Sequence, residues 1–281
     1  MSREARLLVG GLVFPECPRW REGKLWFSDM HGLKVMRADL SGRTETIAEV
    51  TGQPAGLGWL PNGGLLVVSQ TDRRLLRLGR NGLFEVADLS KLAPVSCNDM
   101  VVDNQGRAYI GHFGSHTSVQ PSTWSPAHII LVTPDGGVRV AADNLSFPNG
   151  MVITADGRTL IVAETFGHRL TAFAIQPDGS LTGQRVWAPL ENVAPDGICL
   201  DAEGAIWAAT VANEIVRVKE GGEIVDRVIT STKAFACMLG GVDRRTLFVC
   251  AADSFDAQEV RLKRNGRIEV AQVDVPGAGL P

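Results

Sequence analysis

Four residues with oxygen-bearing side chains stand at equivalent points of this sequence: Glu16, Asn98, Asn149 and Asp196. Each lies seven or eight residues before the turn residue that opens a short apolar run. The same point in two further segments holds Ala55 and Cys237, which lack such oxygens. Carboxylate and carboxamide oxygens are the ligands that hard divalent cations prefer, with water completing the coordination. If the fold gathers these segments around one space, the sequence predicts a divalent metal site.

Each of these four residues also has a purely structural interpretation. Asn149 and Asp196 each precede a glycine, and Asn-Gly and Asp-Gly are common turn dipeptides. Asn98 could cap a loop, whereas Glu16 lies between two prolines and has no evident turn role. Four unrelated turns have no reason to recur at one point of a repeat, so the shared register favours the metal site.

The elements that must position these residues are β-strands. An apolar run follows a turn residue six times, at intervals of roughly 40 to 50 residues: GKLWFSD from Gly23, GGLLVVS from Gly63, GRAYIGH from Gly106, GRTLIVAE from Gly157, GAIWAAT from Gly204 and RTLFVCA from Arg245. We interpret each unit as an inner strand, a tight turn and a second strand, followed by two outer strands. The sequence therefore predicts an all-β fold, a six-bladed β-propeller with four-stranded blades, as a single domain over residues 1–281. A pair of β-sandwich domains is the alternative, but sandwiches need no such regular period.

Composition excludes several other classes of protein. The net charge is −3 and no run of Lys or Arg offers a phosphate-binding stripe, so no nucleic-acid partner is expected. The apolar stretch 7–14 is broken by two glycines, is too short to cross a bilayer and lacks a cleavage site, so no membrane association or export is expected. Five cysteines without a CxxC pair support neither a disulfide framework nor a thiolate zinc site. We expect a cytoplasmic protein, either a monomer or a weak homo-oligomer.

The chain resembles the SMP-30/gluconolactonase/luciferin-regenerating enzyme family nearly from end to end. The segments that carry the resemblance are ECPRW from Glu16, CNDMVVDNQGRAYIG from Cys97, FPNGMVITADGRTLIVAET from Phe147, PDGICLDAEGAIWAA from Pro195 and CMLGG from Cys237. The resemblance implies a six-bladed, calcium- or zinc-dependent lactonase. It also implies that Glu16, Asn149 and Asp196 bind the metal and that Asn98 contacts the substrate.

One departure from the family pattern concerns the substrate. Members that hydrolyse sugar lactones carry an Arg two residues before the Asn of the third unit, and this chain has Ser96 there. An Arg side chain reads hydroxyls or a carboxylate with a rigid fork of donors, so its absence argues against a polyhydroxylated lactone. His112 and His116 are further predicted substrate contacts, because they lie at the end of the third apolar run and in the loop that follows it. Trp124, in the same loop, is expected to cover the pocket.

The combined prediction is a divalent-metal-dependent hydrolase that opens a cyclic ester, with a small-molecule lactone as its partner. One ion would act as a Lewis acid on the carbonyl, and Asp196 would serve as general base. Calcium is the favoured ion, with zinc or manganese as alternatives. A phosphotriesterase-like hydrolase could use the same site. A non-catalytic propeller of the NHL type is the alternative from another class, although it would not need four oxygen ligands in register.

Overall fold

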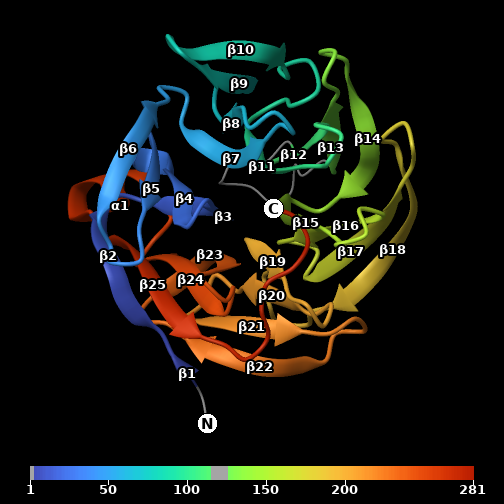
Figure 1. Ribbon diagram of the computed structural model, residues 1–281. Coiled ribbons are helices and arrows are strands. Elements are labelled where there is room, and N and C mark those ends of the chain that lie inside the picture. Colours follow the sequence, from blue (N-terminus) through green and yellow to red (C-terminus); the bar gives the residue numbers. More distant parts are fainter. Residues whose placement is uncertain (1–2, 115–125) are drawn as a thin grey trace.

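The computed structural model describes residues 3–114 and 126–281, which form six β-sheets around a central axis (Figure 1). In each sheet one strand lies nearest the axis and its neighbours follow outward, so each sheet is a propeller blade. The predicted six-bladed, all-β propeller is confirmed.

Blades one to three follow one another along the chain, and neighbouring strands within them are antiparallel. Blade one contains β3 (Pro15–Arg21), β4 (Lys24–Asp29), β5 (Lys34–Ala38) and β6 (Thr44–Glu49), with the short 3₁₀ helix η1 (Met30–Gly32) between β4 and β5. Blade two contains β7 (Pro54–Trp59), β8 (Leu65–Ser69), β9 (Arg74–Gly79) and β10 (Gly82–Asp88). Blade three contains β11 (Cys97–Val102), β12 (Ala108–His112), β13 (Ala127–Val132) and β14 (Val138–Leu145).

Blades four and five continue the same pattern. Blade four contains β15 (Pro148–Ile153), β16 (Thr159–Glu164), β17 (Arg169–Ile175) and β18 (Leu181–Pro189). Blade five contains β19 (Ile198–Leu200), β20 (Ile206–Ala209), β21 (Glu214–Val218) and β22 (Ile224–Ile229).

The sixth blade combines both ends of the chain. It contains β23 (Lys233–Gly240), β24 (Thr246–Ala252) and β25 (Gly266–Gln272), and its outer strand is β2 (Arg6–Leu12). The short β1 (Arg3–Glu4) then pairs in parallel with β22 of blade five. The repeat predicted that the sixth unit supplies all four of its strands, and this prediction was wrong. An N-terminal strand in the last blade closes the ring through backbone hydrogen bonds.

The C-terminal segment crosses one end of the central channel. It passes over the strands of blade five and ends near the axis (Figure 1). Ala278 N donates to Leu200 O at 2.9 Å, and Leu280 exchanges backbone hydrogen bonds with Ile153 at 2.8 and 2.9 Å. Leu200 and Ile153 are the last residues of their inner strands. This segment therefore covers the end of the channel opposite to the starts of those strands, where the predicted ligands lie.

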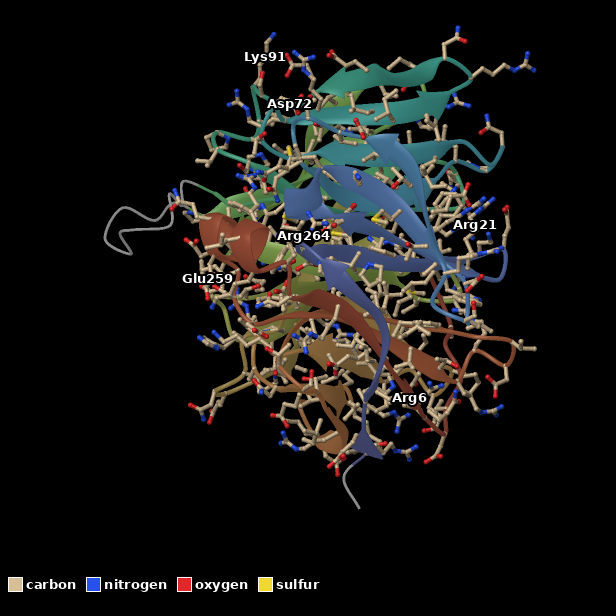
Figure 2. The ribbon with its side chains drawn as sticks, turned by 90° about the vertical axis from the view of Figure 1, so that its left-hand side faces the viewer. Arg6, Arg21, Asp72, Lys91, Glu259 and Arg264 are labelled. Atoms are coloured by element: carbon tan, nitrogen blue, oxygen red, sulfur yellow. The ribbon has the colours of Figure 1, made fainter. Side chains whose placement is uncertain are left out.

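The starts of the inner strands face the side of the molecule that carries α1 (Ala257–Lys263). Figure 2 shows α1 with Glu259 on one side and Arg21, the last residue of β3, toward the opposite side. The Asp256 carboxylate caps α1 by accepting hydrogen bonds from the backbone N–H groups of Gln258 and Glu259. No helix in the described ranges is long and apolar enough to cross a lipid bilayer.

The hydrophobic core lies between the blades. Apolar side chains of neighbouring sheets pack face to face, and the largest fully buried ones include Trp207, Tyr109 and Phe27. Burial on both sides explains why a second strand such as β8 is fully buried and mostly apolar, whereas the outer strands β6 and β10 consist largely of exposed or partly exposed residues. This packing gives the axis a rigid wall on which functional side chains can be held.

Candidate metal centre

The inner strands carry a β-bulge at the predicted ligands. Glu16 and Arg19 of β3 are three residues apart, but their partners on β4, Ser28 and Trp26, are only two residues apart. The same irregularity begins at the first residue of β11 and of β15, at the level of Asn98 and Asn149. A bulge redirects the side chain at that point, and bulges are common beside active sites. The repeat therefore places an oxygen donor at the same distorted position in each of these blades.

Asp196 lies in an equivalent distortion just before β19. Its N–H donates to Ala209 O at 2.9 Å, and Ala209 N donates to Gly197 O at 3.1 Å, so two residues oppose one. Gly150 N also donates to Asp196 O at 3.2 Å, which joins the ligand positions of blades four and five. A Cβ on Gly150 would lie 2.5 Å from the nitrogen of Ile198, so glycine is required for this approach. The glycines after Asn149 and Asp196 thus serve close packing between inner strands rather than hairpin turns.

The two asparagine side chains are oriented by acceptors in neighbouring segments. Asn98 Nδ2 donates to Pro148 O at 3.1 Å, and a carbonyl can only accept. Asn149 Nδ2 donates to Thr165 Oγ1 at 3.2 Å, and this hydroxyl donates its own hydrogen to Pro195 O at 2.8 Å. Both amide nitrogens therefore donate hydrogen bonds within the protein. No described residue donates to either Oδ1, which leaves both carbonyl oxygens available as ligands.

The carboxylates of Glu16 and Asp196 are buried without a cation. Each residue is 7% exposed, and neither forms an ion pair with any described residue. Glu16 Oε2 accepts a hydrogen bond from Cys17 N at 3.0 Å, while the Asp196 carboxylate accepts none from the described residues. Burial raises the pKa of Glu16 to about 8, and it raises the pKa of Asp196, with the Glu16 and Asp99 charges adding to the shift. Buried carboxylates of this kind require a counter-charge to remain ionised.

A buried ion pair that was not predicted from the sequence lies beside these carboxylates. Arg19 Nη2 lies 2.5 Å from Asp99 Oδ1, and both side chains are less than a tenth exposed. Arg19 also donates to the carbonyl oxygens of Leu57, Pro18 and Met100, at 2.9, 2.9 and 2.7 Å. The pair thereby ties blades one, two and three together. Asp99 is the one sign of this pair in the sequence. It is a carboxylate at the point of the repeat where blades four and five have Gly150 and Gly197.

The donor set fits a divalent cation. Arg19 neutralises Asp99, so Glu16 and Asp196 retain a formal charge of about −2 when both are ionised. Two carboxylates with two carboxamide oxygens match the hard-oxygen ligands of Ca²⁺ and leave room for water. Within residues 3–114 and 126–281, no three His, Cys, Asp or Glu side chains are grouped to hold a metal ion. A site here would thus need an amide oxygen as well as the two carboxylates.

The remaining predicted contacts lie at the same end of blade three. Ser96 is partly exposed just before β11, and its carbonyl oxygen accepts a hydrogen bond from Phe113 N at 3.0 Å. His112 is 1% exposed, and its ring nitrogens lie 3.0 Å from Gly114 N and 3.1 Å from His128 N. Burial lowers the pKa of His112 to about 3, so the ring is neutral near pH 7. These contacts fix the backbone around His112, and its contact with substrate stays a prediction. His116 and Trp124 lie outside the described residues.

Sequence comparison identifies the family of this chain. The profile of the SMP-30/Gluconolactonase/LRE-like region matches residues 14–253. The chain belongs to this family. The match covers all four predicted site positions, and the family resemblance seen in the sequence is confirmed.

Several SMP-30/Gluconolactonase/LRE-like relatives resemble the chain at low identity. Regucalcin from Xenopus laevis is 24% identical over 246 residues, which are 84% of this chain and 82% of that protein. Pentonolactonase XacC from Haloferax volcanii is also 24% identical over 246 residues, 84% of this chain and 81% of that protein. The solved structure of a calcium-binding regucalcin from Agrobacterium tumefaciens aligns with a TM-score of 0.82 and 22% identity, covering 100% of this chain and 97% of the other. That structural likeness shows a shared fold.

The raised pKa of Glu16 predicts how the stability of this protein without metal depends on pH. We expect its free energy of unfolding to fall as the pH rises from about 4.5 to about 8, because the pKa of Glu16 is raised from 4.5 to about 8 on folding. In this window the folded state binds more protons than the unfolded state, so raising the pH favours unfolding. Urea denaturation in chelator at several pH values measures the slope. Glu16→Gln should flatten it, whereas the exposed Glu49→Gln should not. An equal slope in all three proteins would contradict the assignment.

Proposed function

We propose that this protein is a divalent-metal-dependent hydrolase that opens a lactone. The observation that carries the proposal is the pair of buried carboxylates, which form no ion pair with any described residue, beside two amides whose carbonyl oxygens are available. Glu16, Asn149 and Asp196 would hold the ion, and Asn98 would lie next to it. Membership of a family whose relatives include a named pentonolactonase and a calcium-binding regucalcin supports both parts of the proposal.

When bound, the ion would supply Lewis-acid polarisation of the lactone carbonyl. Asp196 would accept the proton of the attacking water, and its burial favours this role because burial raises the pKa of the carboxyl group and so makes the carboxylate a stronger proton acceptor. The water oxygen bonds to the carbonyl carbon, the bond from that carbon to the ring oxygen breaks, and the proton returns from Asp196 to the ring oxygen. The product is the hydroxy acid. Asn98 Oδ1 would accept the second hydrogen of the water, since Nδ2 already donates to Pro148 O.

Metal content is the first test of this proposal. The purified protein, dialysed against Ca²⁺, Zn²⁺ or Mn²⁺ and then against buffer, is expected to retain one ion per chain by elemental analysis. Glu16→Gln removes one of two charged ligands and should weaken binding by about tenfold or more. Glu49→Gln, on the outer strand of the same blade, is the matched control. A metal-free protein that opened lactones at full rate in chelator would overturn the proposal.

A substrate panel distinguishes this function from its alternatives. Lactones, activated phosphotriesters and buffer blanks are assayed with the ion that elemental analysis finds. Lactone turnover that the chelator abolishes supports the lactonase, and exclusive phosphotriester turnover would favour the other hydrolase. Tight metal binding without any turnover would favour a non-catalytic propeller.

Ser96 leads to a prediction about hydroxylated substrates. We expect the wild type to show no preference for gluconolactone over γ-butyrolactone, because Ser96 offers no guanidinium fork to sugar hydroxyls. Ser96→Arg should shift the ratio of kcat/KM values toward gluconolactone by about tenfold, the size of a charge-assisted hydrogen bond. Steady-state rates corrected for spontaneous ring opening measure the ratio. Ser96→Met adds length without donors and serves as control. A clear wild-type preference for gluconolactone would show that another residue reads the hydroxyls.

A further inference from the structure

Mostly apolar residues stand two positions before the six equivalent points of the repeat, four of which hold the predicted ligands. The residues two positions before these ligand positions lie at or just before the start of the inner strands. The six positions, which we call the rim, are Phe14, Gln53, Ser96, Phe147, Ala194 and Phe235. None is charged and three are phenylalanines. Phe14 and Phe235 are buried in a hydrophobic cluster between the blades, whereas Phe147 is partly exposed.

Three aromatic side chains, one of them the rim residue Phe147, gather at this end of blades three and four. The rings of Phe113 and Phe147 stack with centroids 4.7 Å apart and an interplanar angle of 18°. The rings of Phe147 and Phe166 also lie 4.7 Å apart, tilted by 49°. Phe166 is 52% exposed, and the other two are partly exposed. We call Phe113, Phe147 and Phe166 the aromatic wall.

The aromatic wall is connected directly to the amide ligands. Phe147 lies two residues before Asn149, and its carbonyl oxygen accepts a hydrogen bond from Thr165 N at 3.1 Å. Thr165 also holds the Asn149 amide, and Phe166 follows it in the chain. Phe147 directly precedes β15, so it lies at the same end of blade four as Asn149. The wall and the amide oxygens therefore belong to one site.

The backbone of Phe147 is in a conformation that bulky residues rarely adopt. Its φ is 61°, in the left-handed region that favours glycine. Such strain persists where the surrounding structure enforces it, and it concentrates at functional sites. Here it accompanies a ring that lies between Phe113 and Phe166 rather than in the core between blades.

We infer that the substrate carries an aromatic or extended apolar substituent, and that the aromatic wall binds this substituent while the lactone ring faces the carboxylates. This inference rests on the proposed function and adds the substrate class. The charged groups Glu16 and Asp196 come from blades one and five, whereas the wall comes from blades three and four. The end of the channel at which the inner strands start thus has a polar side for the reacting ester and an apolar side for the substituent. Aromatic faces bind rings and alkyl chains by area burial and by stacking.

The test compares γ-butyrolactone with γ-phenyl-γ-butyrolactone, which differ only in the substituent. The wild type is expected to prefer the phenyl lactone by about tenfold in kcat/KM, mostly through a lower KM, because the wall contributes binding rather than chemistry. Phe166→Ala should remove most of that preference, because it should raise the KM for the phenyl lactone more than the KM for γ-butyrolactone. Phe84→Ala is the matched control, since Phe84 is 50% exposed on the outer strand of blade two. No phenyl preference in the wild type, or an unaltered preference in Phe166→Ala, would overturn the inference.

Binding of lactams separates this inference from the proposed function. Lactams resist hydrolysis, so calorimetry with 2-pyrrolidinone and 5-phenyl-2-pyrrolidinone needs no turnover. The phenyl compound is expected to bind about tenfold more tightly to the wild type, and Phe166→Ala should lose this difference. If no lactone is hydrolysed but the difference is present, the proposed function fails and the apolar subsite stands. If lactones are hydrolysed and the difference is absent, the subsite is wrong and the lactonase stands.

Discussion

Replacing Asp196 by asparagine is expected to lower kcat for lactone opening by about 10²–10⁴-fold, the usual effect of losing a general base. Asparagine has nearly the same shape and can still offer an oxygen to the ion, but it cannot accept the proton of the attacking water near pH 7. Asp196 is 7% exposed and accepts no hydrogen bond from the described residues, so its replacement breaks no such contact. The metal-free variant should be at least as stable as the wild type, because a buried charge near Glu16 and Asp99 is removed.

Steady-state kinetics, metal content and thermal melting of the Asp196→Asn protein measure these effects. Asp201→Asn is an informative control, because Asp201 is 1% exposed just beyond the other end of the same inner strand and pairs with Arg217 at 2.7 Å. That control should melt at a lower temperature while the folded enzyme keeps its kcat. If Asp196→Asn retains metal and wild-type kcat, the base is another group and the assignment of Asp196 fails.

Arg19→Met is expected to cost about 3–5 kcal/mol of unfolding free energy, the usual effect of breaking a buried ion pair. The substitution leaves the Asp99 carboxylate, 6% exposed, with the hydrogen bond from Met100 N but without its cation. It also removes the donor for the carbonyl oxygens of Leu57 and Pro18, which are themselves in the packed inner region. Buried acceptors and charges without partners account for the size of the effect.

Urea denaturation of the metal-free proteins measures this loss. The double variant Arg19→Met/Asp99→Asn removes the unpaired charge and should recover part of the stability. Arg185→Met is the control, because Arg185 and Glu220 form an ion pair on the surface, with both side chains more than half exposed. Such a pair contributes about 0–1 kcal/mol. Equal losses for Arg19→Met and Arg185→Met would show that the pair beside the ligands does not support the fold.

The repeat in the sequence determined the architecture and the position of the candidate ligands along it. An apolar run after a turn residue, recurring six times, can be buried only if successive units pack against each other, and this requirement leads to a propeller. Because equivalent positions of a repeat take equivalent places around one axis, the register alone predicts a common site for Glu16, Asn98, Asn149 and Asp196. The motifs around them were also sufficient to recognise the family.

Only the tertiary structure decided how these side chains are held. The donors of Asn98 and Asn149 are fixed by Pro148 and Thr165, and these hydrogen bonds follow from the packing of segments rather than from any local pattern. The pairing of Arg19 with Asp99 joins residues 80 positions apart. The same holds for the closure of the sixth blade by β2 and for the stacking of Phe113 on Phe147. A periodic sequence specifies which positions are equivalent, but contacts between different blades depend on bulges, turns and side-chain volumes that have a defined arrangement only once the ring is closed.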